Sequence, residues 1–282
     1  LLASILCLSS SAGNVSLTWI RFICTSSYCC SGDTIIIIWI YASELVLLDA
    51  HQVKATCFFL GYIAGRYPHL VRETAERGHE IGSHGMYHKL IYKMTSEEFY
   101  EDALSSRLLL ESVSGKRVDC FRSPSFSIIE ATPWFFDNLT RAGYVSDSSM
   151  FPVKRERGGY LTKNVGPHWV KTKLGNICEF PISVAPIFGK DVCFFGGGYL
   201  RLFPKWLILC MQNKLSGKGI PTLFYIHPRE IDPLHPRLKM SAWLHFKTYI
   251  NMKTVRPKLE AIFHSNSFVT CHEYMITKMM DK

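Results

Sequence analysis

The stretch GHEIGSHGMYH at residues 78–88 decides the fold, because a turn, a short apolar run and a polar loop follow one another in it. Its first glycine is typical of a left-handed helix end after residues 69–77, and residues 80–83 predict a short strand. His84 and His88 follow directly, four residues apart. Imidazole nitrogens are common zinc ligands, and two ligands so close in sequence lose little chain entropy on binding one ion. The stretch therefore predicts a strand that delivers two metal ligands, although the spacing alone also fits two loop histidines without a metal.

Predicted strands and helices alternate on both sides of this stretch. Residues 53–60 predict a strand, and TSEE at residues 95–98 is a capping box that opens a helix ending near Gly115. Further strands are predicted at residues 119–121, 144–146, 177–182, 222–226 and 267–271, and further helices at residues 132–142, 205–214 and 257–265. Such alternation is typical of an α/β fold with a parallel, barrel-like sheet, in which functional residues gather where strands end.

Length, charge and cysteine positions limit the class of protein. A chain of 282 residues can bury one sizeable core, and its net charge of +9 favours an acidic partner, whether an anionic polysaccharide, a membrane surface or a nucleic acid. The basic residues are scattered and no nucleic-acid motif accompanies them, so binding to DNA or RNA is not expected. The cysteines after residue 50 are far apart and form no Cys-x-x-Cys pair. We interpret them as reduced, which favours a cytoplasmic location.

Residues 1–44 differ from the remainder of the chain. Arg21, Asp33 and Glu44 are the only charged residues there, while Ser, Cys, Thr and Ile dominate. We therefore divide the sequence into an atypical segment, residues 1–44, and a catalytic domain, residues 45–282. The sequence begins at Leu rather than Met, which we interpret as a fragment, and a mistranslated frame ahead of a genuine gene would also explain the composition.

Two apolar runs in this segment need an interpretation. The run at residues 35–42 is too short to span a bilayer and also fits a buried strand. Residues 1–8 resemble the apolar part of a secretory signal but lack the basic residues that precede one. No transmembrane span is expected.

Three further motifs follow predicted strands. They are RSPSF at residues 122–126, GYVSDSS at residues 143–149 and FYIHP at residues 224–228. In this order, and after the histidine loop, they resemble the polysaccharide deacetylases of the NodB-homology family (carbohydrate esterase family 4-like). The branch they resemble most is the one associated with bacterial exopolysaccharide clusters. The resemblance covers residues 45–271 and implies a distorted (β/α) barrel that is incomplete at its N-terminus.

The resemblance implies a metal-dependent hydrolase that removes N-acetyl groups from a polysaccharide. His84 and His88 are the implied metal ligands, with Zn²⁺ as the expected ion, whose bound water becomes acidic enough to attack the acetyl carbon. Arg122 is implied to hold the carboxylate of a general base, and His227 to protonate the leaving amine as general acid. Asp147 is expected to orient His227 or a neighbour, and it fits equally a turn residue that bonds the amides of the next two serines.

Substrate contacts are expected from two loops. A backbone amide near Ser125 is implied to stabilise the oxyanion, with Phe126 beside it. In GGGYLR at residues 196–201, Tyr199 is expected to stack on a sugar ring and Arg201 to meet an anionic group. This loop lacks the lysine and the spacing of phosphate-binding loops, and a tight turn that needs small residues is the alternative.

The early aspartate motif of the family, which carries the third metal ligand and the general base, is missing. By register it would fall at residues 14–22, NVSLTWIRF, which hold no carboxylate. The chain is therefore expected to bind zinc weakly and to have little deacetylase activity, and an Asp-x-Asp segment near residues 18–21 is expected to restore turnover. The alternatives are a non-catalytic carbohydrate-binding relative and a different metallohydrolase that shares only the histidine pair.

Overall fold

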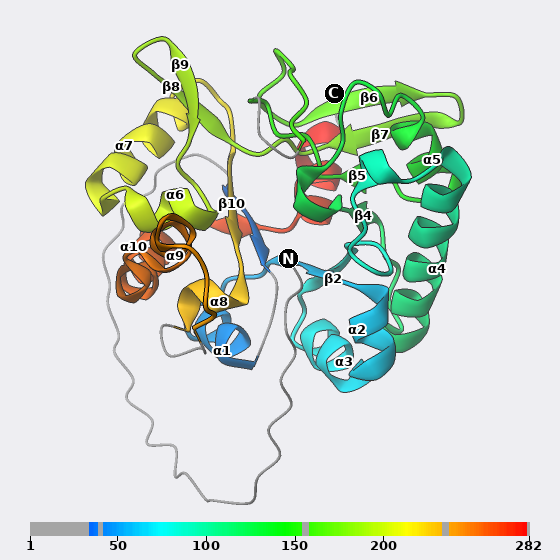
Figure 1. Cartoon of the computed structure of the whole chain (residues 1–282), viewed down its shortest axis with the longest axis horizontal. Helices are drawn as coiled ribbons and strands as arrows, with labels where there is room; N and C mark the ends of the chain where they lie inside the picture. The colour runs from blue at the N-terminus through cyan, green and yellow to red at the C-terminus, as the bar shows by residue number, and fades with distance from the viewer. Residues whose placement is uncertain (1–33, 39–41, 154–157, 233–236, 281–282) are drawn as a thin grey trace, which may run out of the picture.

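The expected α/β class with a parallel sheet is confirmed in a computed structural model, which describes residues 34–38, 42–153, 158–232 and 237–280 (Figure 1). The strands of the main sheet are β1 (Thr34–Ile38), β2 (Thr56–Phe59), β3 (Glu80–Ser83), β4 (Cys120–Phe121), β5 (Ser146–Asp147), β6 (His168–Thr172), β7 (Gly175–Glu179), β10 (Thr222–Ile226) and β11 (Phe268–Val269). Their order is β10-β1-β2-β3-β4-β5-β7-β6, with β11 paired to β1. All pairs are parallel except β6 with β7. Within the described residues no pairing joins β6 back to β10, so we describe the expected α/β fold as a parallel sheet.

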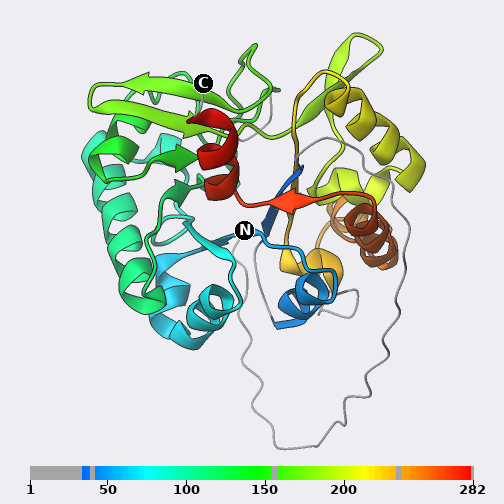
Figure 2. The same ribbon diagram turned by 180° about the vertical axis from the view of Figure 1, so that it is seen from behind.

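Strand β1 lies inside the segment that composition set apart as residues 1–44. Ile38 pairs with Ile226 of β10 and with Cys57 of β2, and β11 pairs with the start of β1, as Figure 2 shows from behind. The sheet therefore begins before the expected boundary, and the strand interpretation of the run at residues 35–42 is confirmed for Thr34–Ile38. The expected position of the aspartate motif, residues 14–22, lies outside the described residues.

Helices cover both sides of the sheet. On one side lie α2 (Gly61–Arg66), α3 (Pro68–Glu76), α4 (Ser96–Ser114) and α5 (Phe135–Arg141); on the other lie α6 (Gly197–Leu202), α7 (Lys205–Ser216), α9 (Ala242–Tyr249) and α10 (Val255–His264) (Figure 1). Helices α1 (Ala42–Ala50), α8 (Pro228–Ile231) and α11 (Cys271–Tyr274) are short, and β8 (Val184–Ile187) with β9 (Lys190–Cys193) forms a hairpin that the sequence did not predict. In the described part of the chain, no helix combines the length and hydropathy that crossing a membrane requires.

The ends of α4 agree with the sequence prediction. The Thr95 hydroxyl accepts a hydrogen bond from the Glu98 amide (3.2 Å), and the Glu98 carboxylate accepts one from the Thr95 amide (2.7 Å), which completes the capping box. Gly115 ends the helix in the left-handed conformation, with φ 64°. These short-range signals fix the helix without help from the rest of the fold.

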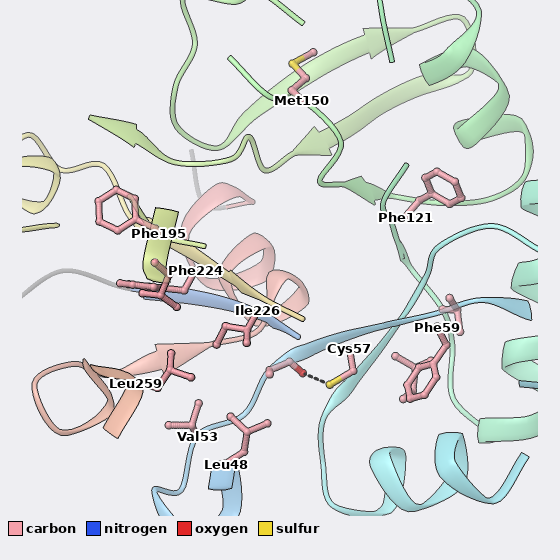
Figure 3. Packing of buried hydrophobic residues seen from close by; sticks show 14 of the residues in the cluster. Leu48, Val53, Cys57, Phe59, Phe121, Met150, Phe195, Phe224, Ile226 and Leu259 are labelled. Carbon is pink, nitrogen blue, oxygen red and sulfur yellow. Dashed lines mark hydrogen bonds between the residues drawn. The ribbon is translucent and has the colours of Figure 1, made fainter. Parts of the chain in front are cut away.

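The strands that lead to the histidine loop and to His227 are buried along their length. All residues of β2 and β10 are buried, as are the last three of β3, because apolar side chains of two clusters pack against these strands. Figure 3 shows how Phe224 and Ile226 of β10 meet Val53 and Leu259 in this core. Close packing on both faces leaves the carboxyl ends of these strands little freedom, so the loops that follow them start from fixed positions.

Candidate active site

The histidine loop begins where β3 ends. His84 is 1% exposed, and its Nδ1 lies 2.7 Å from the carbonyl oxygen of Arg122. A carbonyl only accepts, so Nδ1 carries the proton and the lone pair resides on Nε2. The His88 ring lies 5.1 Å from the His84 ring, measured between centroids. Left-handed backbone at Gly85 (φ 77°) and His88 (φ 57°) turns the loop so that the two rings meet.

Both imidazoles are held in the neutral form, which is the form that binds metals. Burial lowers the pKa of His84 well below its usual value, and the neighbouring His88 lowers it further. Desolvation in the loop also lowers the pKa of His88. The charge of His227 adds to both shifts, so His227, which follows β10, lies near the pair.

Arg122 is a buried cation without an acidic hydrogen-bond partner among the described residues. It is 1% exposed, and one terminal nitrogen donates to the Ser148 hydroxyl at 2.6 Å. The guanidinium carbon lies 5.1 Å from the ring centroids of both Phe58 and Phe126. Within the described part of the chain, Nε and the other terminal nitrogen make no hydrogen bond. Burial accordingly lowers the pKa of Arg122 to about 10.

A series of ring contacts joins Arg122 to His227. The Phe126 ring, which packs on the Arg122 guanidinium, lies 5.6 Å from the Tyr225 ring. The Tyr225 ring lies in turn 5.9 Å from the His227 ring. The backbone carbonyl of Arg122 also accepts the hydrogen bond from His84. These contacts therefore connect the segments that follow β3, β4 and β10. The structure thus brings together four residues that sequence reasoning selected separately.

His227 has a carboxylate partner that sequence reasoning missed. The His227 backbone amide donates to Glu230 Oε2 at 3.1 Å, and its ring Nδ1 lies 3.6 Å from the same oxygen. Glu230 is fully buried, and Arg201 lies 3.0 Å from its other oxygen. Burial alone would raise the pKa of Glu230, but the contacts with His227 and Arg201 outweigh it and lower the pKa. A signal was present in the sequence, since HPRE places a carboxylate three residues after the histidine.

The position of Arg201 corrects an expectation. It was expected to meet an anionic group of the substrate, but it is 2% exposed and its guanidinium binds Glu230 and the carbonyl oxygen of Lys247 (2.9 Å). A long cationic side chain is usually at the surface, and here a buried carboxylate holds it inside. Arg201 therefore acts on Glu230 and not on an external anion.

The glycine-rich loop packs tightly against β10. A Cβ on Gly196 would lie 2.2 Å from the Tyr225 ring, so only glycine fits at this position. The interpretation as a tight turn that needs small residues is confirmed there. Tyr199 is 38% exposed, and its ring is parallel to that of Phe203, 6.4 Å away. Its contact with a sugar stays a prediction.

Asp147 is fully buried and accepts hydrogen bonds from the Ser149 amide (3.0 Å) and the Ser149 hydroxyl (2.7 Å). The turn interpretation is confirmed for Ser149 but not for Ser148, whose amide donates to the Phe121 carbonyl (2.9 Å). That Asp147 orients His227 or a neighbour stays a prediction. Across the sheet Asp147 pairs with Glu179, whose carboxylate accepts from the Met150 amide at 2.8 Å. Burial raises the pKa of Asp147 to about 6, and burial with the Asp147 charge raises that of Glu179 well above its usual value. The two carboxyl groups therefore bind protons more readily than exposed carboxyl groups do.

The loop after Arg122 is a short helical turn, Pro124–Phe126. Ser125 is left-handed there, with φ 57°, and the Phe126 amide donates to the Ser123 carbonyl at 3.1 Å. Phe126 is 8% exposed and also packs on Phe151, so most of its ring is committed to the protein interior. An oxyanion contact from the amide near Ser125 stays a prediction.

The described residues fit half of a zinc site. His84 and His88 offer two neutral nitrogens that lie side by side. A hydrolytic zinc site needs a third protein ligand, and the described part of the chain holds no group of three His, Cys, Asp or Glu side chains placed to bind a metal.

Comparison with known proteins divides the chain in two. Residues 40–143 match the family profile described as polysaccharide deacetylase. These residues are similar to the polysaccharide deacetylase family. They contain the histidine pair and Arg122. Residues 148–276, which contain Arg201, His227 and Glu230, match a second profile, a domain of unknown function (DUF3473).

Individual relatives agree with this division. Two peptidoglycan-N-acetylglucosamine deacetylases of Bacillus cereus are 32% identical to the chain over 83 residues and 33% identical over 100 residues. These matches cover 29% and 36% of this chain and 30% and 45% of the relatives' own lengths. The chain thus spans less than half of each relative.

A solved structure supports the fold across both parts. The crystal structure of a putative polysaccharide deacetylase from Mycobacterium smegmatis is similar with a TM-score of 0.54 at 16% sequence identity. The similarity covers 86% of this chain and 88% of that one. The fold of this chain is therefore similar to that of the Mycobacterium smegmatis structure through both parts.

Proposed function

We propose that this chain carries the site of a metal-dependent polysaccharide N-deacetylase whose turnover is low because the general base is missing. The observation that carries the proposal is the meeting of His84, His88, Arg122 and His227 at the carboxyl ends of parallel strands. An N-acetylated polysaccharide is the substrate class, and the names of the Bacillus cereus relatives support it.

In this proposal the histidine pair holds a divalent cation, with Zn²⁺ as the best fit to two imidazole nitrogens. When bound, the ion would lower the pKa of a water molecule and polarise the acetyl oxygen. The hydrogen bond from His84 Nδ1 to Arg122 fixes the tautomer, so Nε2 is the ligand atom of that ring. The amide near Ser125 supports the oxyanion, and Tyr199 contacts a sugar ring.

His227 is the proposed general acid. Its side chain is 35% exposed, so a substrate amine can reach the ring, while Glu230 is buried behind it. The Glu230 carboxylate stays ionised because Arg201 and His227 contact it, and it stabilises the imidazolium that donates the proton. The protonated ring then gives its proton to the amine that leaves the acetyl carbon.

The base would be expected beside Arg122, at the end of β1. The residues that follow β1 in the sequence are Trp39, Ile40 and Tyr41, none of which is a carboxylate. Arg122 donates instead to the Ser148 hydroxyl. The same observation favours a second candidate function, that of a protein that binds N-acetylated glycan without hydrolysing it.

We further propose an exopolysaccharide as the polymer. The sequence HPREIDP at residues 227–233 and the glycine-rich loop at residues 196–201 resemble the exopolysaccharide-associated branch of the family. Both lie in the part of the chain that matches the domain of unknown function.

Repair of the base tests the proposal. Acetate release from N-acetylated chitooligosaccharide is measured with Zn²⁺ for the wild type, for Trp39→Asp with Tyr41→Asp, and for Thr18→Asp with Ile20→Asp, which places Asp-x-Asp at the position expected from sequence. A general base contributes about 10²–10⁴-fold, so one repaired chain is expected to release acetate at least about a hundredfold faster. His227→Gln in that background is the control and should abolish the gain.

The outcomes separate the two candidate functions. No gain from either repaired chain, with zinc bound and the fold intact, counts against a deacetylase site. Saturable binding of the oligosaccharide by the wild type, together with no gain on repair, supports the binding protein. Loss of zinc from His84→Ala, measured by metal analysis, checks the ligand assignment apart from activity.

A further inference from the structure

Helix α9 exposes apolar side chains that nothing in the described protein covers. Of its eight residues only Tyr249 is buried. Trp243 is 68% exposed, Phe246 50% and Leu244 38%, and Leu238 just before the helix is 49% exposed. Water contact with an apolar surface of this extent is unfavourable, and on soluble proteins such surfaces mark interaction sites.

Basic side chains surround these apolar residues. Lys247 Nζ lies 5.6 Å from the centre of the Trp243 ring, and the Arg237 guanidinium lies 5.4 Å from that of Tyr249. Lys239 is exposed between them in sequence, and residues 237–247 contain no acidic side chain. This combination of cations with indole and aliphatic groups is typical of surfaces that enter the headgroup region of a bilayer.

The charge of the whole chain resides mainly in this region. Residues 197–260 contain eleven Lys and Arg against three Asp and Glu, a net charge of +8, while the chain as a whole has +9. Glu230, one of the three acids, is buried in its ion pair with Arg201. Asp232 and Glu260 are at least partly exposed, but the exposed Lys and Arg side chains outnumber them, which favours an anionic partner.

We propose that the α9 patch, defined as Arg237, Leu238, Lys239, Trp243, Leu244, Phe246 and Lys247, binds the surface of an anionic lipid bilayer. Tryptophan and phenylalanine enter the interface between headgroups and acyl chains, and lysine and arginine meet lipid phosphates. A second copy of the chain would bring two surfaces of like charge together, which disfavours a dimer through this patch. A glycan would use the indole face but leave the aliphatic groups in water.

The patch is connected to the candidate active site. Arg201 donates to the carbonyl oxygen of Lys247 in α9 and binds Glu230 in α8, which contacts His227. Figure 1 shows α9 among α6, α8 and α10. Binding at α9 would therefore hold the His227 side of the molecule next to the bilayer. The proposal does not depend on the catalytic function.

Vesicle flotation of the full chain tests whether the α9 patch binds an anionic bilayer. The wild type is mixed at low salt with vesicles of phosphatidylglycerol and phosphatidylcholine, or with phosphatidylcholine alone. It is expected to float with the anionic vesicles only, and less so as salt rises. Trp243→Ala with Phe246→Ala is expected to weaken binding more than about tenfold, because most of the inserted apolar area is lost. Lys239→Glu with Lys247→Glu should weaken it at least about tenfold, since each cation near an anionic surface contributes about fivefold.

Phe188→Ala is the matched control. Phe188 is 99% exposed on the turn between β8 and β9, outside the patch, and its loss should leave flotation unchanged. Thermal unfolding of each variant shows that the fold persists. The proposal is overturned if the wild type does not float with anionic vesicles, or if neither double variant weakens flotation. It is also overturned if the α9 variants change only dimerisation in sedimentation or only oligosaccharide binding.

Discussion

Arg122 and Arg201 are both buried guanidinium groups, 1% and 2% exposed, and they differ in what holds them. Arg201 forms an ion pair with the buried Glu230, while Arg122 has a serine hydroxyl and two phenylalanine rings. A buried charge without a counterion is unfavourable by several kcal/mol. The contrast teaches that, in the described part of the chain, a carboxylate pairs with Arg201 near the end of β10 and none is hydrogen-bonded to Arg122.

The two arginines also differ in where their carboxylate partners lie relative to the two family matches. Arg201 and Glu230 both lie in residues 148–276, so one part of the chain supplies both halves of the ion pair. The partner expected for Arg122 belongs to a motif ahead of residue 40, where the deacetylase match begins. If the resemblance holds, Arg122 depends on a distant N-terminal segment for its counterion, whereas Arg201 and Glu230 lie in one part of the chain.

The largest expected effect is that of Glu230→Gln. The variant leaves Arg201 buried without its counterion, so the free energy of unfolding is expected to fall by about 3–5 kcal/mol. Urea denaturation measures it. The control is Glu260→Gln, which breaks the exposed pair of Arg256 and Glu260 and should lower stability by less than about 1 kcal/mol. Equal losses of unfolding free energy in Glu230→Gln and Glu260→Gln would contradict the importance of the buried ion pair between Arg201 and Glu230.

A second test concerns the helix that carries Arg201. Lys258 Nζ donates to the carbonyl oxygens of Leu200, Arg201 and Phe203 at 2.8–3.1 Å, which closes the end of α6. Lys258→Met leaves these acceptors unpaired, and the free energy of unfolding is expected to fall by about 2 kcal/mol. Lys253→Met, at an exposed position, should change it by less than about 0.5 kcal/mol. An unchanged free energy of unfolding in Lys258→Met would show that the hydrogen bonds of Lys258 are not needed to hold Arg201 in place.

A third test measures how the stability of the protein depends on pH through Asp147. Burial raises the pKa of Asp147 to about 6, above the unfolded value, so the folded state binds more protons. The contribution of Asp147 is then fully present below the unfolded pKa and is lost as pH rises through about 6. Between about pH 5 and pH 8 the wild type should lose about 1–2 kcal/mol of stability that Asp147→Asn does not lose. Parallel pH profiles from urea denaturation would contradict this.

The smallest effect is expected from Arg122→Met. The change removes a buried charge that no carboxylate neutralises within the described residues, and the methionine can pack on the same two rings. The free energy of unfolding should change by less than about 1 kcal/mol, in either direction. A loss as large as that of Glu230→Gln would mean that Arg122 has a strong partner after all.

The sequence predicted best those features that depend on neighbours along the chain. The capping box of α4 and its terminal glycine need only a few consecutive residues, and both are confirmed. The convergence of the His84 and His227 loops could be expected because both follow strands of one parallel sheet. Resemblance to a family supplied the order of the motifs.

The features that the sequence did not predict depend on tertiary contacts. Nothing local shows that Arg201 lies inside, because only the distant Glu230 makes that position favourable. The apolar run at residues 35–42 fitted a strand, but its place between β10 and β2 depends on partners distant in sequence. The net charge alone did not decide whether the acidic partner is an anionic polysaccharide, a membrane surface or a nucleic acid.

The place of β1 has a consequence for the synthesis of the molecule. This strand leaves the ribosome among the first parts of the sheet, but its pairing partner β10 emerges near the end, since Thr34 pairs with Thr222. Contacts so distant in sequence form late and slow the folding of a domain. The histidine pair can gather on a nascent fragment, whereas His227 reaches it only after almost the whole polypeptide has been translated.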